Sequence, residues 1–228
     1  KHGILDENIK FITSGEVATE AQKGGKNILE KVINIVSEYK KEYTLSGICI
    51  STAGMVDCEK GEIIHASDLI PNYTGTQIKK TLEGIFSIPC EVENDVNCAG
   101  LAEYFSGSAK GSSISLCLTI GTGIGGSIII NDKVFHGFSG SACEVGYMNI
   151  FKSKFEDLGA TSILVKKVAK LKNCSENHID GKLIFEMAKN NDEDCIKAID
   201  EMVDILGMGI ANICYVINPE VVVLGGGI

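Results

Sequence analysis

Apolar residues recur along the chain with two different periods. Short apolar runs of about three to seven residues predict strands, and longer stretches with apolar residues every three or four positions predict helices. We expect strands at 3–5, 10–16, 45–51, 62–66, 90–92, 113–119, 124–130, 133–135 and 221–224. Helices are expected at 27–39, 76–86, 96–105, 161–171, 182–189 and 192–217. This alternation is typical of an α/β fold.

A polar, glycine-rich stretch interrupts the alternation at 106–111. We place a domain boundary there, with an N-terminal α/β domain at 1–106 and a C-terminal α/β domain at 107–228. The last predicted helix contains Gly207 and Gly209. We expect these two glycines to allow close packing onto the final strand.

The composition narrows the class of protein. Of the 228 residues, 44% are hydrophobic, which is enough for a buried core. The 21 basic and 30 acidic side chains give a net charge of −9 without any basic cluster, so a nucleic-acid partner is not expected. No apolar run reaches the roughly 18 residues of a membrane span, and the chain shows no secretory leader. We therefore expect a globular, cytoplasmic protein.

Nine cysteines raise the alternatives of a disulfide framework or a metal site. No two of them are spaced as C-x-C or C-x-x-C, their number is odd, and the neighbours of several are apolar. We interpret them as reduced thiols that serve as small core residues in a reducing compartment.

The segment E-N-D-V-N follows the predicted strand 90–92 directly. Asp95 lies where the strand gives way to a helix, and the commonest role of an aspartate there is to cap the helix. The alternative is a general base, because phosphoryl transfer to an alcohol needs a carboxylate that orients the hydroxyl and accepts its proton. Asn94 beside it favours the second interpretation, since an amide can bind vicinal hydroxyls.

The sequence G-T-G-I-G-G lies between two predicted strands, at Gly121 to Gly126. It is either an ordinary hairpin turn or a phosphate-binding turn, because consecutive glycines let several backbone N–H groups approach a phosphate and Thr122 adds a hydroxyl. It is followed by a strand and lacks Gly-Lys-Ser/Thr, which excludes a Rossmann fingerprint and a P-loop. Together the two motifs suggest phosphoryl transfer to a polyol.

A third segment, Gly137 to Tyr147, resembles the signature G-x-x-G-x-A-G-E-x-G-H of the ROK family of bacterial sugar kinases and related repressors. The two earlier motifs occur in the same order in that family, and the resemblance covers nearly the whole chain. It implies a two-domain actin-like ATPase, or ribonuclease H-like, fold with an inter-domain cleft. The implied activity is ATP-dependent phosphorylation of a hexose or hexose derivative (glucose, N-acetylmannosamine, fructose or a β-glucoside), with ATP and Mg²⁺ bound and a homodimeric assembly.

The resemblance also assigns roles to individual residues. Asp95 is implied as the catalytic base. The implied sugar ligands and the residues that line the sugar pocket are Gly54, Ser67, Asn94, Glu144, Tyr147 and Glu156. The implied phosphate ligands are Gly121, Thr122, Gly123 and Gly125, and Gly225, Gly226 and Gly227 are implied to approach the adenosine.

The chain departs from the family pattern in three places. Tyr147 replaces the usual histidine, and 149–154 contains neither Cys nor His where a zinc cluster is usual, so no zinc is predicted. We expect packing of Tyr147, Phe151 and Phe155 to hold this loop instead. The first predicted strand lacks a partner before it, and the last predicted strand runs into a glycine turn without a continuation, so we expect the chain to be truncated at both ends and to lack the first phosphate-binding strand.

Two other classes remain open at this point. The first is a sugar-responsive transcriptional regulator, which would need a helix-turn-helix segment ahead of Lys1. The second is a catalytically silent sugar-binding protein, which the departure at Tyr147 makes plausible.

Overall fold

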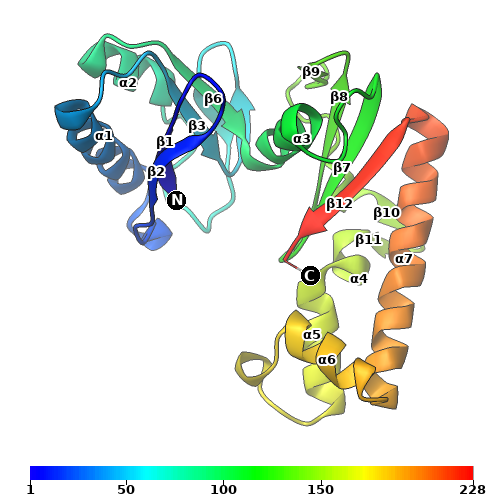
Figure 1. The fold of residues 1–228 in the computed structure, drawn as a ribbon. Coiled ribbons are helices and arrows are strands. Elements are labelled where there is room, and N and C mark those ends of the chain that lie inside the picture. Colours follow the sequence, from blue (N-terminus) through cyan, green and yellow to red (C-terminus); the bar gives the residue numbers. More distant parts are fainter. Residues whose placement is uncertain (228) are drawn as a thin grey trace. The chain divides into compact units, whose positions relative to one another are not determined.

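The computed structural model describes residues 1–227 (Figure 1). The chain divides into two compact units, Lys1–Asp95 and Val96–Ile228. Each unit is a mixed α/β structure with a hydrophobic core of its own.

The first unit contains three two-stranded sheets and two long helices. The pairs are β1–β2 and β4–β5, which are antiparallel, and β3–β6, which is parallel. The strands are β1 (His2–Leu5), β2 (Phe11–Gly15), β3 (Ile48–Thr52), β4 (Met55–Asp57), β5 (Glu62–His65) and β6 (Cys90–Asn94). The helices are the short 3₁₀ turn η1 (Ala21–Lys23), α1 (Gly25–Glu42) and α2 (Ile78–Phe86).

Strands β3 and β6 both contribute residues to the core of the first unit. Ile63, Leu82 and Cys90 are fully buried, and burial of each large apolar side chain contributes roughly 1.5–3 kcal/mol to folding. In the parallel register Thr52 lies opposite Asn94, so the carboxyl ends of both strands meet at one edge. Polar residues that follow the two strands are therefore brought together.

The second unit is built on a four-stranded sheet of order β12-β7-β8-β9, in which only β12 runs parallel to its neighbour. Its strands are β7 (Ile114–Ile120), β8 (Ile124–Ile130), β9 (Lys133–Val134) and β12 (Val221–Gly226), with a separate hairpin of β10 (Asn149–Ile150) and β11 (Ser153–Lys154). Its helices are α3 (Asp95–Ser106), η2 (Val145–Tyr147), α4 (Glu156–Gly159), α5 (Thr161–Leu171), η3 (Glu176–His178), α6 (Gly181–Lys189) and α7 (Glu193–Ile217).

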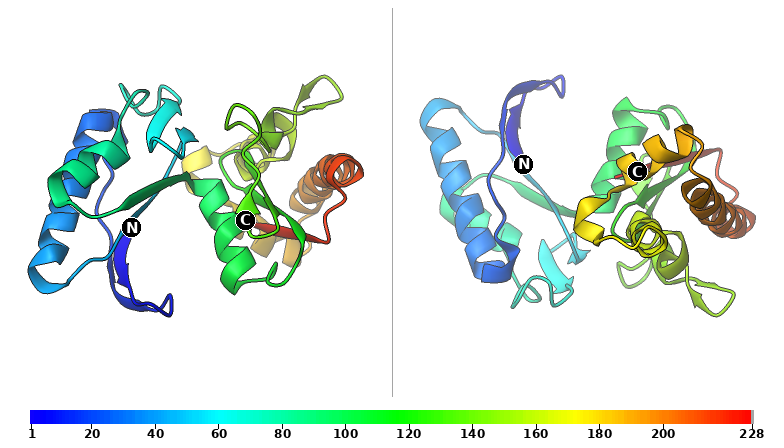
Figure 2. Two further views of the ribbon diagram at one scale, coloured as in Figure 1. Left: turned by 90° about the horizontal axis from the view of Figure 1, so that it is seen from above. Right: turned by 90° about the horizontal axis from the view of Figure 1, so that it is seen from below.

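The two faces of this sheet carry different helices. Because side chains alternate along a strand, Leu116 and Leu118 of β7 belong to the main core with α5, α6 and α7, whereas Cys117 belongs to a smaller cluster on the opposite face. Helix α3 covers that opposite face (Figure 2). Gly100 of α3 lies there against Ser127 and Cys117. This packing puts α3 in the second compact unit, whereas the sequence places the domain boundary after it, at 106/107.

Helix α7 shows one packing contact that differs from the expectation. Gly209 does not face the final strand; it faces the ring of Phe155, which is fully buried. Gly207, two residues earlier, has no neighbour within 4 Å of the position that a Cβ would take. The reason is the helical period, which turns the two glycines to different sides of α7.

The loop at 149–154 forms the β10–β11 hairpin, which the apolar pattern does not predict because each strand has only two residues. Phe155 after it is buried as expected, but Tyr147 and Phe151 are 58% and 75% exposed. Of the three aromatic residues expected to hold this loop by packing, Phe155 alone is buried and anchors it.

The nine cysteines are free thiols in the structure. Burial raises the pKa of the Cys90 thiol to about 11, which keeps it protonated and unreactive at neutral pH. Among residues 1–227, no helix is both long and apolar enough to cross a membrane.

The two glycines of α7 give a matched pair of variants. We expect Gly209→Ala to lower the free energy of unfolding by about 1–3 kcal/mol, because the new methyl group overpacks the Phe155 site. Gly207→Ala should raise it by up to about 1 kcal/mol, because alanine is the better helix former and the position is open. Urea unfolding measures both values, and shifts of the same sign in the two variants would contradict this packing.

Candidate functional site

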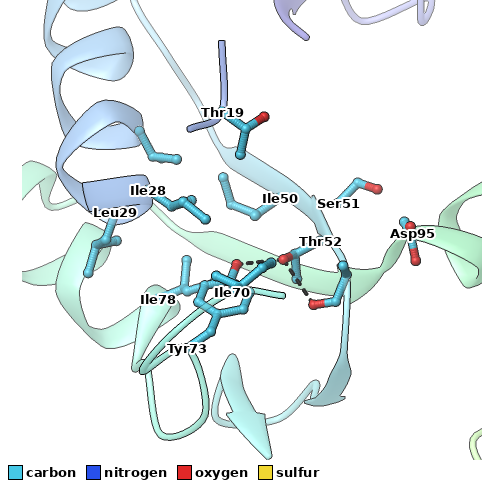
Figure 3. A pocket seen from close by; sticks show the side chains of 12 residues that line it. Thr19, Ile28, Leu29, Ile50, Ser51, Thr52, Ile70, Tyr73, Ile78 and Asp95 are labelled. Carbon is cyan, nitrogen blue, oxygen red and sulfur yellow. Dashed lines mark hydrogen bonds between the residues drawn. The ribbon is translucent and has the colours of Figure 1, made fainter. Parts of the chain in front are cut away.

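A pocket of about 280 Å³ opens in the first unit between α1 and β3 (Figure 3). Its wall is largely apolar, and Asp95 lies at its rim as the first residue of α3. The lining residues are Thr19, Ile28, Leu29, Val32, Ile50, Ser51, Thr52, Ala53, Ile70, Tyr73, Ile78 and Asp95.

Tyr73 anchors the floor of this pocket. Its hydroxyl lies 2.5 Å from the hydroxyl of Thr52 at the end of β3. Burial raises the pKa of Tyr73, and the hydrogen bond with Thr52 opposes that rise only in part. Tyr73 is therefore a neutral phenol that holds the β3 end in place. Sequence reasoning missed both residues, because nothing in the local pattern pairs positions 52 and 73.

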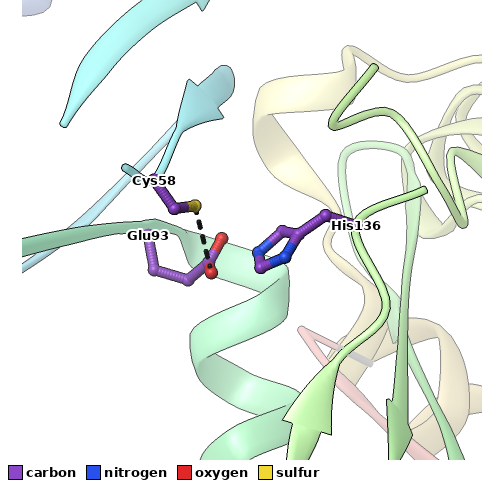
Figure 4. Close-up of side chains that lie close together, drawn as sticks. All are labelled: Cys58, Glu93 and His136. Atoms are coloured by element: carbon purple, nitrogen blue, oxygen red, sulfur yellow. Dashed lines mark hydrogen bonds between the residues drawn. The ribbon is translucent and has the colours of Figure 1, made fainter. Parts of the chain in front are cut away.

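Asn94 is oriented by contacts with its neighbours. Its Nδ2 donates to the carbonyl oxygen of Gly54 at 3.0 Å, and its backbone N–H donates to Glu93 Oε1 at 2.8 Å. The thiol of Cys58 donates a weak hydrogen bond to Glu93 Oε2 at 3.3 Å (Figure 4). The amide that the sequence suggested as a sugar ligand is thus held at a fixed orientation beside Asp95.

Gly54 and Ser67 lie near the same end of the first unit. Gly54 has a φ of 97°, and a Cβ there would lie 2.7 Å from the carbonyl oxygen of His65 and 3.3 Å from the Cβ of Ala66. Ser67 follows Ala66 and lines a hollow formed by the loop up to Thr74. The four candidate residues of the first unit, Gly54, Ser67, Asn94 and Asp95, therefore come from loops and strand ends at one end of it.

In the second unit the G-T-G-I-G-G segment forms the turn between β7 and β8. The N–H of Gly121 donates to the carbonyl oxygen of Gly123 at 3.0 Å, and Thr122 at the tip is exposed. We call residues Gly121, Thr122 and Gly123 the glycine turn. Such a turn is compatible with both interpretations raised by the sequence, a hairpin and a phosphate ligand.

The final glycine segment ends beside the glycine turn. The N–H of Gly227 donates to the carbonyl oxygen of Ile120 at 2.9 Å, one residue before the turn. Gly226 has a φ of 119° and lies so close to the backbone of Ile120 that no side chain fits. The two segments implied to bind phosphate and adenosine are therefore adjacent in the structure.

Glu156 lies against the same turn. A Cβ placed on Gly123 would be 2.6 Å from Glu156 Oε2, and one placed on Gly146 would be 3.0 Å from it. Glu156 is half-buried, and no hydrogen bond or ion pair to its carboxylate occurs among the described residues. A carboxylate that is partly withdrawn from water without a protein partner is suited to a ligand with hydroxyl donors.

The segment Cys143 to Tyr147 packs over the start of β8. Cys143 adopts a left-handed backbone with φ 65°, and its Sγ lies against Gly126. Burial raises the pKa of this thiol to about 12, so it acts as a packing group. Glu144 precedes the turn η2, and the ammonium of Lys154 lies 4.6 Å from the centre of the Tyr147 ring. The candidate ligands of this segment thus lie on a framework built around β8.

The candidate residues divide between the two units. The first unit holds the residues around Asp95, and the second holds Glu144, Tyr147 and Glu156 together with both glycine segments. Within the second unit the structure brings Glu156, Gly123 and Gly146 into contact. Sequence reasoning did not single out Ser162, whose Oγ donates to the carbonyl oxygen of Thr122 in the glycine turn at 2.7 Å, because its only signal was a hydroxyl at the start of a predicted helix.

Comparison with known proteins agrees with this architecture. The ROK family model matches residues 1–228. An uncharacterized protein of Clostridium perfringens is 50% identical over 228 residues, which are 100% of this chain and 77% of that protein. The beta-glucoside kinase of Klebsiella pneumoniae is 30% identical over 236 residues, covering 100% of this chain and 78% of its own length.

A solved structure shows the same fold. A putative N-acetylmannosamine kinase from Listeria monocytogenes superposes with a TM-score of 0.87 at 28% identity, covering 99% of this chain and 78% of that one. The expected actin-like ATPase fold is thereby confirmed. The family match along the whole length, together with the 30% identical kinase, answers the question that the three sequence motifs raised: this chain belongs to the ROK family.

Proposed function

We propose that this protein is an ATP-dependent sugar kinase that phosphorylates a hexose or a hexose derivative. The observation that carries the proposal is the position of Glu156. The carboxylate implied as a sugar ligand lies against Gly123, which is implied as a phosphate ligand, and against Gly146 of the third motif. Sugar and phosphate ligands that adjoin in one unit are what transfer between the two substrates requires.

On the nucleotide side, backbone groups would make most of the contacts with ATP. Gly121, Thr122, Gly123 and Gly125 would bind the phosphates, and Gly225 to Gly227 would approach the adenosine from the adjacent strand end. Glu156 beside Gly123 repels a phosphate anion, so a cation is needed there. Mg²⁺ bound to phosphate oxygens, with Glu156 as the nearby carboxylate, would offset that repulsion.

On the sugar side, Asp95 would accept the proton of the attacking hydroxyl. Asn94, whose Nδ2 is bound to Gly54, would present its amide to adjacent sugar hydroxyls. Phosphoryl transfer needs little more than positioning and charge stabilisation, so one carboxylate at the hydroxyl is sufficient. The hydroxyl at the 6-position of a hexose is the expected acceptor, since it is primary and the least hindered.

The choice of sugar depends on Glu144, Tyr147 and the loop around Ser67. Tyr147 stands where the family pattern has a histidine, and its ring is paired with the Lys154 ammonium. A screen of glucose, N-acetylmannosamine, fructose and β-glucosides with an ADP-release assay identifies the substrate. Sugar binding without turnover would favour the silent sugar-binding protein instead, and binding to operator DNA would favour the regulator.

The cellular setting follows from the reaction. A kinase that uses ATP acts where ATP is abundant, so we place the protein in the cytoplasm. We also propose a homodimer, which gel filtration with light scattering tests directly.

Asp95→Asn should abolish sugar phosphorylation. The amide cannot accept the hydroxyl proton, so kcat should fall roughly 10²-fold to 10⁴-fold while sugar and ATP binding persist. Steady-state kinetics and calorimetric binding measure the two effects. Asp132→Asn, in the exposed turn between β8 and β9, is the matched control and should leave kcat unchanged. An active Asp95→Asn enzyme would refute the role of the base.

Glu156→Gln should raise the KM for sugar. A hydrogen bond to a charged group contributes roughly 1.5–3 kcal/mol, so the expected rise is roughly tenfold to 150-fold. The neighbouring exposed carboxylate gives the control, because Asp157→Asn removes the same charge without removing a ligand. Equal KM values for the two variants would exclude Glu156 as a sugar ligand.

A further inference from the structure

Ser162 belongs to none of the three motifs, yet it contacts the glycine turn directly. We propose that Ser162 is the positioning residue of the phosphate-binding turn. The inference rests on the proposed function, because it assumes that this turn binds nucleotide phosphates. It adds a residue that sets the direction of the turn's N–H groups.

Two hydrogen bonds connect Ser162 to the turn. Its backbone N–H donates to the carbonyl oxygen of Gly121 at 3.2 Å, and its Oγ donates to the carbonyl oxygen of Thr122 at 2.7 Å. The two carbonyl groups belong to consecutive peptide units. One residue therefore fixes the orientation of two adjacent peptide planes.

The orientation of these planes determines where the N–H groups point. In a planar trans peptide the C=O and N–H bonds point in opposite directions. The carbonyls of Gly121 and Thr122 point toward Ser162, so the N–H groups of Thr122 and Gly123 point away from it. Within residues 1–227 neither N–H has a hydrogen-bond acceptor. Two adjacent N–H groups directed to the same side form an anion-binding concavity.

The anchor for this arrangement is rigid. Ser162 is the second residue of α5, and the helix is fixed in the main core by Leu164, Val168 and Ala169, each 2% exposed or less. The turn itself has many allowed backbone conformations, because Thr122 has a glycine on either side. A rigid helix that holds such a turn in one conformation through two hydrogen bonds is a preorganising device.

A purely structural role for Ser162 would have a different signature. The residue before α5, Ala160, provides no side-chain cap, so the bond to Gly121 also satisfies one N–H at the helix start. That bond involves the backbone of Ser162 and survives a change of side chain. Only the bond from Oγ to Thr122 is lost in Ser162→Ala, which isolates the effect on the turn.

The test compares three ligands on three variants. Calorimetry measures the binding of adenosine, ADP and a non-hydrolysable ATP analogue, the last two with Mg²⁺, to the wild type, Ser162→Ala and Ser162→Thr. We expect Ser162→Ala to weaken ADP and analogue binding roughly tenfold, with adenosine binding and the melting temperature unchanged. Ser162→Thr keeps a hydroxyl and should restore binding. Ser175→Ala removes the hydroxyl that accepts from the N–H of Asn177 at the start of η3 in the same unit, and it should leave the binding of all three ligands unchanged.

The outcomes separate the two proposals. A wild-type protein that binds none of the three ligands refutes the proposed function and with it the role of Ser162. If the wild type binds ADP and Ser162→Ala binds it with the same affinity, only the role of Ser162 is overturned. Equal losses for adenosine and ADP, or no recovery in Ser162→Thr, would also overturn it, because the effect would not depend on the phosphates and the hydroxyl.

Discussion

Lack of space around the start of β8 is the constraint on which the second unit depends. A side chain at Gly123 would meet the Glu156 carboxylate, one at Gly125 would meet Val96, and one at Gly126 would meet Cys143. Packing therefore requires glycine at Gly125 and Gly126, whereas at Gly123 the neighbour is the end of the flexible Glu156 side chain. Glycine brings conformational freedom that folding must remove, and the hydrogen bonds from Ser162 remove it at the tip of the turn.

The same arrangement of strand ends organises both units. In the second unit, β12 runs parallel to β7, so the glycines at the end of β12 and Gly227 after it reach the turn that follows β7. In the first, β3 runs parallel to β6, so Gly54 after β3 meets Asn94 at the end of β6. Parallel pairing collects the polar groups after separate strands at one edge, which is where ligands bind in α/β proteins. Residues 40 or more positions apart in the sequence thereby become neighbours.

Local pattern predicted the long elements well, and it failed where a contact between distant residues decides the structure. Helix α5 has the expected bounds because it carries an apolar helical period, and β8 has them because a short apolar run follows the glycine-rich turn. The hairpin at 149–154 was missed because two-residue strands have no period. Gly209 was assigned to the wrong partner, since only the folded chain brings Phe155 to it. Ser162 and the Thr52–Tyr73 pair were invisible for the same reason.

Phe155 shows how core packing can set the geometry of a site. Its ring is fully buried against Gly209, and its N–H donates to the carbonyl oxygen of Met148 at 2.7 Å. Both contacts fix the backbone immediately before Glu156. Core packing therefore fixes the backbone from which the Glu156 side chain extends. Its carboxylate reaches Gly123 and Gly146 without a hydrogen bond of its own among the described residues. In a loop whose sequence lacks the usual Cys and His residues, one buried aromatic side chain and the glycine that accommodates it supply the required rigidity.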